Sequence, residues 1–116
     1  MRGNVQISGK NVEMLANAAS PILYKKVFRR DWFKTLTETQ TDESGVEGIS
    51  YFEEMGFIMA MQAEKTTQEL LALSYDNYIE WISQFEPEDM MVAVGDIAGI
   101  YRAQENTGSE LKKEDG

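Results

Sequence analysis

Residues 51–63 read YFEEMGFIMAMQA, and this stretch decides the fold. Apolar residues recur in it every three or four positions, which predicts a helix from Ser50 to about Lys65. Phe57 and Met61 share a second apolar face, because they lie one helical turn apart and off the main stripe. That second face either binds a partner or is buried in a central helix surrounded on all sides. The main stripe consists of Tyr51, Phe52, Met55, Ile58, Met59 and Ala63.

Upstream of this stretch, the pattern predicts two short helices and a loop. Ser20 and Pro21 are a typical helix start, with serine as the N-cap and proline in the first turn. The apolar stripe that follows does not continue beyond Arg30-Asp31, so we expect a break there and a second short helix. Residues 37–48 are polar and lack periodicity, which is typical of a surface loop.

Downstream, two further helices and a tail are predicted. Pro87 is placed in the first turn of a last long helix, which we expect to reach Tyr101 or slightly beyond. Residues 106–116 are polar and unpatterned, and they are predicted to form a disordered tail. Ser74 is placed to cap the preceding helix, whose apolar face consists of Tyr75, Tyr78, Ile79, Ile82 and Phe85.

The N-terminal segment alternates apolar and polar residues around a turn. Residues 5–7 and 12–14 flank the turn-forming residues 8–11, which predicts a short β-hairpin within residues 1–15. A lone hairpin is only marginally stable in water, so it should pack on the helices or on a neighbouring subunit. The predicted fold is therefore mainly α: a single domain over residues 1–105, in which a small N-terminal β-hairpin is followed by about five helices in a compact bundle.

The composition limits the possible functions. The chain has 116 residues, a formal net charge of −9, and neither Cys nor His. Without these two residue types, disulfides, thiol catalysis, the commonest general base and the usual zinc sites are excluded. An acidic surface repels phosphates and anionic lipids, so nucleic acid and membranes are poor partners. No apolar run is long enough to span a membrane, and residues 1–10 contain no apolar signal-peptide segment, so we expect an intracellular protein. We also expect no cofactor and no metal ion.

A basic cluster lies early in the acidic chain. It contains five of the eleven basic residues: Lys25, Lys26, Arg29, Arg30 and Lys34. The cluster is either a docking face for an acidic surface or the solvated face of an amphipathic helix. A second copy of the chain offers such an acidic surface in Asp76, Glu80, Glu86, Glu88 and Asp89.

The last predicted helix has a smooth face opposite its apolar stripe. Val92, Gly95 and Gly99 form this face. Each glycine costs about 1 kcal/mol in a helix relative to alanine. Close approach of another helix would offset that cost, either inside the monomer or between copies in a homo-oligomer.

Paired carboxylates are the remaining candidates for chemistry. Glu53-Glu54 and Glu88-Asp89 are residue pairs of the kind that act as acid and base or bind a hard cation. No histidine and no glycine-rich phosphate loop accompany them in the sequence. We therefore interpret them as solvated helix ends and expect no enzymatic activity.

The order of these features resembles a known family. Residues 18–31 read AASPILYKKVFRRD. They are similar to a segment of the tail assembly chaperones of long-tailed bacteriophages and prophages of Gram-positive bacteria. In that family the segment contains small residues, then Pro, an apolar residue, Tyr followed by Arg or Lys, and Phe-Gly-x-Asp. Residues 78–85, YIEWISQF, resemble the tryptophan-bearing helix of that family, and the resemblance covers about residues 4–104. Arg29 is a departure, because the family often has glycine there.

The resemblance implies an all-helical fold with a small hairpin and a protein without enzymatic activity. It implies that the protein coats the tape measure protein until tail-tube subunits polymerise around it. The chaperone is then shed, so it acts in the bacterial host cytoplasm and is absent from the mature virion. The alternative function is that of a small acidic adaptor or regulatory protein that binds one folded partner. The candidate protein-binding residues are Phe57, Met61, Val92, Gly95, Gly99, Lys25, Lys26, Arg29 and Arg30.

Overall fold

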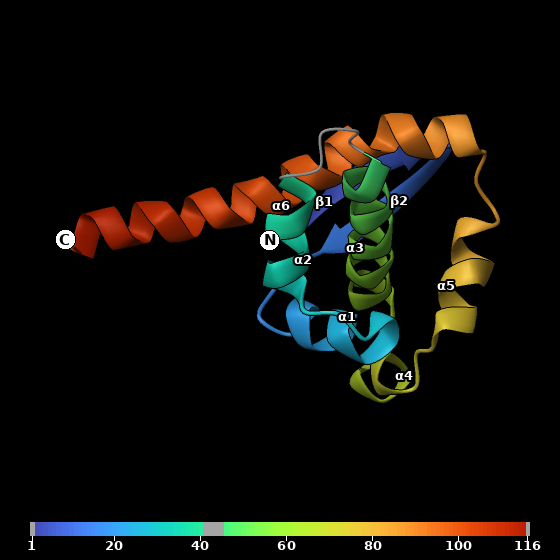
Figure 1. Cartoon of the computed structure of the whole chain (residues 1–116), viewed down its shortest axis with the longest axis horizontal. Coiled ribbons are helices and arrows are strands. Elements are labelled where there is room, and N and C mark those ends of the chain that lie inside the picture. The colour runs from blue at the N-terminus through green and yellow to red at the C-terminus, as the bar shows by residue number, and fades with distance from the viewer. Residues whose placement is uncertain (1, 41–45, 116) are drawn as a thin grey trace.

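The computed structural model describes the backbone of residues 2–40 and 46–115, and the side chains of residues 2–38 and 48–101. A hairpin followed by six helices confirms the predicted, mainly helical fold class (Figure 1). The elements are β1 (Arg2–Ile7), β2 (Lys10–Leu15), α1 (Ser20–Phe28), α2 (Trp32–Gln40), α3 (Val46–Glu64), α4 (Thr67–Leu71), α5 (Tyr75–Ile82) and α6 (Pro87–Asp115).

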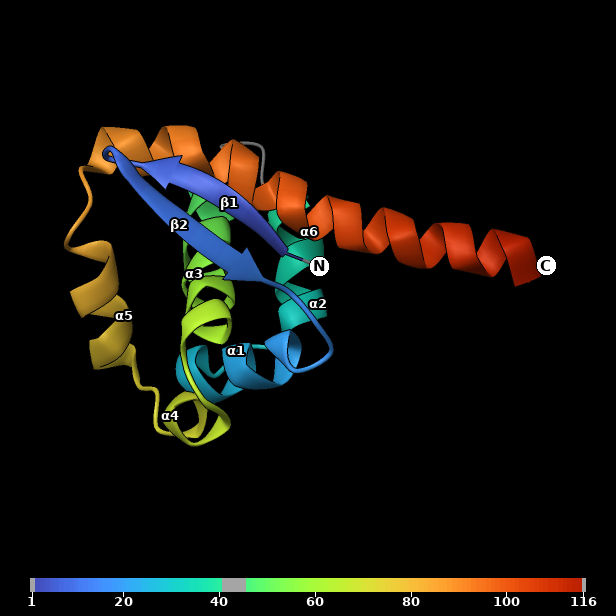
Figure 2. The ribbon, with the colours of Figure 1, turned by 180° about the vertical axis from the view of Figure 1, so that it is seen from behind.

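The predicted hairpin forms and packs on the helices of its own chain. Ser8 and Gly9 both have positive φ angles, 51° and 79°, so they form the type I′ turn that suits a two-residue hairpin. This turn sets the antiparallel register in which β1 pairs with β2. Val5, Ile7 and Met14 are buried, because one face of the hairpin lies against α3 and α6 (Figure 2). The opposite face carries polar side chains.

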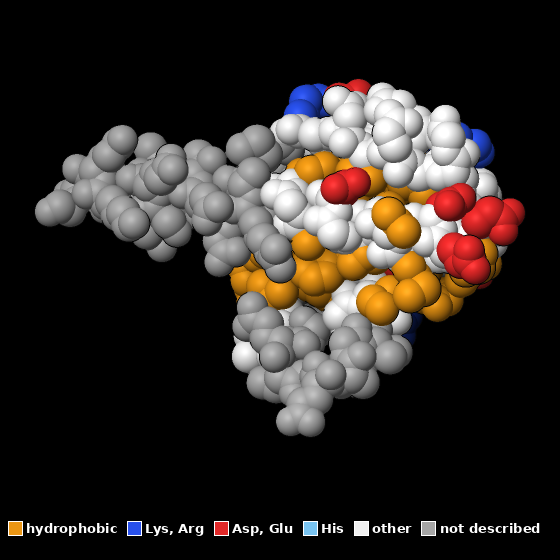
Figure 3. All heavy atoms as spheres, turned by 90° about the horizontal axis from the view of Figure 1, so that it is seen from above, with side chains coloured by type: hydrophobic (Ala, Val, Ile, Leu, Met, Phe, Trp, Pro, Cys, Tyr) orange, Lys and Arg blue, Asp and Glu red, His pale blue; other side chains and the backbone are white. Residues whose placement is uncertain are grey.

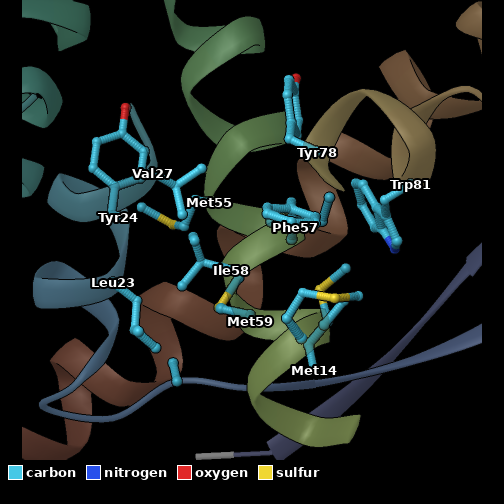
Figure 4. Close-up of a cluster of buried hydrophobic side chains, with 14 of the residues drawn as sticks. Met14, Leu23, Tyr24, Val27, Met55, Phe57, Ile58, Met59, Tyr78 and Trp81 are labelled. Carbon is cyan, nitrogen blue, oxygen red and sulfur yellow. The ribbon is translucent and has the colours of Figure 1, made fainter. Parts of the chain in front are cut away.

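Helix α3 forms the centre of the molecule. Every residue from Met55 to Gln62 is buried, because the hairpin and α1, α2, α5 and α6 all contact this helix. Figure 4 shows the cluster of aromatic, aliphatic and methionine side chains around it. The helix begins at Val46, earlier than predicted, so Ser50 lies inside it and does not cap it.

The break predicted near residue 30 is confirmed. Helix α1 ends at Phe28, and Arg29 adopts the left-handed conformation with a φ of 58°. The N–H of Arg29 donates to the carbonyl of Lys25 at 2.8 Å, which closes the last turn of the helix. The carboxylate of Asp31 then accepts from the N–H of Lys34 at 2.8 Å, which caps the start of α2.

Two further helix starts follow the sequence signals. Ser74 is the N-cap of α5, and its N–H donates to the side chain of Asn77 at 2.9 Å. Pro87 is the first residue of α6, as predicted. The short helix α4 was not expected, and it is fixed by a capping box between Thr66 and Glu69.

Two segments predicted to be irregular are helical in part. Helix α2 continues to Gln40, so only residues 41–45 of the predicted loop separate it from α3, and these lie outside the described residues. The backbone of α6 is helical through Asp115, where the sequence predicted a disordered tail over residues 106–116. Residues 110–114, ELKKE, have the propensity to continue a helix, whereas residues 106–109, NTGS, do not.

Candidate functional site

Helix α6 presents an exposed apolar surface, which we call the α6 face: Met91, Val92, Gly95 and Gly99. The exposed fractions of Met91 and Val92 are 58% and 79%, values unusual for large apolar side chains on neighbouring positions. The opposite side of the helix is the core side, where Met90, Ala93 and Ile97 are buried. Seen from the side on which α6 lies, exposed hydrophobic side chains are bordered by acidic ones near the start of the helix (Figure 3).

The two glycines of the α6 face are not explained by packing inside the monomer. A Cβ atom added at Gly95 or Gly99 would meet nothing within 4 Å among the described residues. Gly3 and Gly56 differ, because a Cβ there would lie 2.8 Å from Ile100 and 2.9 Å from Ile97. Of these four glycines, only Gly3 and Gly56 are required by contacts among the described residues, and packing within that part of the chain does not offset the cost of Gly95 and Gly99.

Phe57 and Met61 do not form a surface, and the interpretation of their side of α3 as partner-facing is wrong. Phe57 is completely buried, and Met61 is only 7% exposed. Helix α5 covers this side of α3 with large aromatic side chains (Figure 4). The ring of Phe57 lies 5.5 Å from that of Tyr78 and 5.7 Å from that of Trp81. The alternative interpretation, a central helix surrounded on all sides, therefore holds.

Two residues of the basic cluster are bonded through their side chains to other parts of the chain, and three are exposed without an ion pair to any described residue. Arg30 forms an ion pair with Glu54 of α3, and Lys26 donates to the carbonyl of Leu73 at 3.3 Å. Lys25, Arg29 and Lys34 are exposed and form no ion pair with any described residue. The acidic residues predicted to complement the cluster are exposed too, on α5 and at the start of α6.

The paired carboxylates Glu53 and Glu54 are not solvated helix ends. They are the eighth and ninth residues of α3 and are partly buried. The hydroxyl of Tyr24 donates to Glu54 at 2.8 Å, and Arg30 forms an ion pair with the same oxygen, which joins α1 to α3. Burial raises the pKa of Glu54, and the bonds to Tyr24 and Arg30 offset this only in part. Burial also raises the pKa of Glu53, with the charge of Glu54 as the second cause. Glu54 therefore joins α1 to α3, and the partial burial of Glu53 costs stability when its carboxyl group is ionised. The sequence indicated neither.

A cleft that the sequence analysis missed lies between β2 and α5. It has a volume of about 640 Å³, within the range of ligand-binding pockets. Its floor is apolar and its rim is polar. No sequence signal predicts this cleft, because it arises from the distance between a strand and a helix more than sixty residues apart. It is lined by residues 10–13 of β2, by the C-terminal part of α3 with Lys65, by Leu73, and by Asn77, Glu80, Trp81, Gln84 and Phe85.

Comparisons with known proteins found no relative of this chain. No family model, curated protein or solved structure matches the chain. Among the described residues, no helix is long and apolar enough to cross a membrane. The same part of the chain contains no group of three or more acidic side chains that could hold a metal ion. The candidate binding surfaces are the α6 face, the exposed basic residues Lys25, Arg29 and Lys34, and the cleft.

Proposed function

We propose that this protein is a non-catalytic chaperone that binds and solubilises another polypeptide. The α6 face is the observation that supports this function. Two large apolar side chains lie exposed beside two glycines that no contact among the described residues requires. Such a surface allows the backbone of a client helix to approach closely, while Met91 and Val92 supply the apolar contact.

We further propose that the client is a tape measure protein. The motifs in residues 18–31 and 78–85 support this choice, because their order resembles that of tail assembly chaperones. On this proposal the protein acts in the bacterial host cytoplasm. It leaves the client when tail-tube subunits polymerise, and it is absent from the mature virion.

The small apolar area of the α6 face suits reversible binding of a client. Apolar contact contributes about 25 cal/mol per Å² buried, so a patch built from two large side chains binds weakly by itself. Many copies along a long client would bind it firmly in total, and each would remain displaceable. The net charge of −9 would keep the coated client in solution.

Self-association of the chaperone is part of the proposal. Lys25, Arg29 and Lys34 extend from the α1–α2 region, and the acidic residues Glu86, Glu88 and Asp89 surround the start of α6. Figures 1 and 2 show α1 at the bottom of the molecule and the start of α6 at its top. A contact between these surfaces would therefore be head-to-tail and would repeat from copy to copy.

Co-expression with the tape measure protein tests the proposal. The double variant Met91→Asp with Val92→Asp should stay folded, because both side chains are exposed, but should leave the client insoluble. Ile22→Asp is the matched control: Ile22 is 69% exposed on α1, and its replacement should leave client solubilisation intact. Normal solubilisation by the double variant would contradict the assignment of the client site to α6.

The composition of the purified complex separates the chaperone from an adaptor. A chaperone that coats its client should be recovered with several copies per tape measure chain. Recovery of one copy with one folded protein, and none with the tape measure protein, would instead identify the small acidic adaptor function.

A further inference from the structure

We propose that the cleft between β2 and α5 binds an extended peptide segment of another protein, which adds to the free edge of β2 as a third strand. The peptide has alternating apolar residues and at least one basic residue. This inference does not depend on the proposed chaperone function, because the cleft is lined by no residue of the α6 face.

The outer edge of β2 carries unpaired backbone groups. Ile7 and Lys10 flank the two-residue turn and therefore form a hydrogen-bonded pair, as does the pair Val5 and Val12. The intervening residue Asn11, and Glu13 after it, consequently direct their N–H and C=O groups away from β1. These groups have no backbone partner among the described residues. Such an edge is a template for another strand.

The cleft follows this edge. It is lined by four consecutive residues of β2, from Lys10 to Glu13, and by none of β1. Consecutive strand residues point to opposite faces of a sheet, so a cavity that touches all four lies beside the edge of the strand. Figure 2 shows α5 on the β2 side of the hairpin. The unpaired groups of Asn11 and Glu13 therefore face the cleft.

The floor of the cleft suits every second side chain of an added strand. Apolar side chains from β2, α3 and the α5 region form it: Val12, Ala60, Met61, Trp81 and Phe85. In an added strand, alternate side chains would point to this floor and the others to solvent. The rim carries the side-chain amides of Asn77 and Gln84, whose oxygens accept from Ser74 and Lys10.

The opposite wall decides the kind of occupant. Helix α5 lines the side of the cleft facing β2, so the cleft accepts a single strand but not a strand that carries a folded domain on its other edge. A second folded copy of this chain would bring such a domain with its own hairpin. The occupant is therefore a flexible segment of a different protein.

The charges around the cleft favour a basic peptide. Three carboxylates and two ammonium groups line it. Glu13 is paired with Arg2, and Lys10 already donates to Gln84 at 3.1 Å. Glu80 is exposed and forms no ion pair within the described part of the chain. A lysine or arginine of the peptide beside Glu80 would provide the missing counter-charge.

A labelled octapeptide of alternating valine and lysine, with blocked termini, tests the proposal by fluorescence polarisation. Asn11→Pro removes one outward N–H without breaking a backbone hydrogen bond of the hairpin, and it should weaken binding about tenfold. It also removes the side-chain bond between Asn11 and Gln6. Gln6→Pro is the matched control, because Gln6 lies directly opposite Asn11 on the edge that does not face the cleft. Its affinity should stay within about twofold of the native value. Glu80→Gln should weaken binding about threefold, and an alternating valine–glutamate peptide should bind less tightly.

Amide hydrogen exchange on the native protein gives a second readout that needs no variant. The N–H groups of Asn11 and Glu13 should exchange fast in the free protein and become protected when the valine–lysine peptide is added. Peptide binding without this protection, equal affinities of both proline variants, or no binding at millimolar peptide would overturn the proposal. Protection that rises with protein concentration alone would overturn it in favour of a second copy.

Discussion

Gly56 of α3 lies directly against Ile97 of α6, and a Cβ atom at this glycine would lie 2.9 Å from Cδ1 of Ile97. Real Cβ atoms essentially never come this close to another heavy atom. Ile97 is completely buried, so its side chain has little room to move. The distance between the central helix and α6 therefore depends on this glycine, whereas Gly95 and Gly99 face open space.

Replacement of these glycines by alanine should change stability in opposite directions. Gly95→Ala and Gly99→Ala should each raise the free energy of unfolding by about 1 kcal/mol, because alanine is the better helix former. Gly56→Ala gains the same propensity but overpacks the core, which costs about 1–3 kcal/mol, so the net change should be between zero and a loss of about 2 kcal/mol. Urea denaturation of the three variants measures these values. A stabilised Gly56→Ala would show that α3 and α6 separate easily.

The same variants connect stability with function. If the α6 face binds a client helix closely, Gly95→Ala and Gly99→Ala should be more stable than the native protein yet solubilise less client. Their methyl groups would hold the two backbones apart. Soluble tape measure protein recovered after co-expression is the measurement. Unchanged recovery with both variants would indicate that the glycines do not serve client binding.

Arg29→Gly should stabilise the protein. Arg29 has a φ of 58°, a left-handed conformation that costs a residue with a side chain about 1–2 kcal/mol and glycine very little. The side chain forms no ion pair among the described residues, so little is lost with it. We expect the free energy of unfolding to rise by about 1 kcal/mol. Arg29→Ala is the control, because it removes the charge but retains the strain, and it should not stabilise.

Local signals in the sequence predicted most of the backbone. The alternation around residues 8–11, the Ser20-Pro21 pair and Pro87 each specify a turn or a helix start through a few neighbouring residues. The break near Arg29 was predicted from the loss of the apolar stripe, and Arg29 adopts the left-handed conformation there.

Contacts between distant segments were not predictable in this way. The pattern of α3 indicated two apolar sides, but it contained nothing to show that Tyr78 and Trp81 would cover the side of Phe57. The pairing of Glu54 with Tyr24 and Arg30 joins residues 24 or more positions apart, and the cleft beside β2 depends on where α5 comes to lie. The α6 face was predictable, because its glycines and Val92 lie on one helix.

Phe57 should behave as a core residue. Truncation of a buried phenylalanine to alanine costs about 3–5 kcal/mol, so Phe57→Ala should remove a large part of the stability of a domain of this size. Val92→Ala, on the exposed α6 face, should change the free energy of unfolding by no more than about 0.5 kcal/mol. Thermal denaturation followed by circular dichroism compares the two. A small effect of Phe57→Ala would mean that α5 does not cover α3 in solution.

Glu53→Gln should make the protein more stable at neutral pH. Burial, followed by repulsion from Glu54, raises the pKa of Glu53 in the folded protein above the ordinary value of 4.5. The folded state therefore binds this proton more tightly than the unfolded state does. The resulting stability is fully present below pH 4.5 and is lost as the pH rises through the raised pKa of Glu53.

Neutral glutamine removes this dependence. We expect Glu53→Gln to exceed the native protein in stability at pH 7 by less than about 1 kcal/mol, because the carboxyl group is only partly buried. At pH 4 the two proteins should be nearly equal, since Glu53 is then largely protonated. Urea denaturation at both pH values measures the difference. Glu88→Gln is the control: Glu88 is exposed in the first turn of α6, where a negative charge is favourable, so its replacement should not stabilise at pH 7. A gain with Glu53→Gln that is the same at pH 4 and pH 7 would contradict the burial of this carboxyl group.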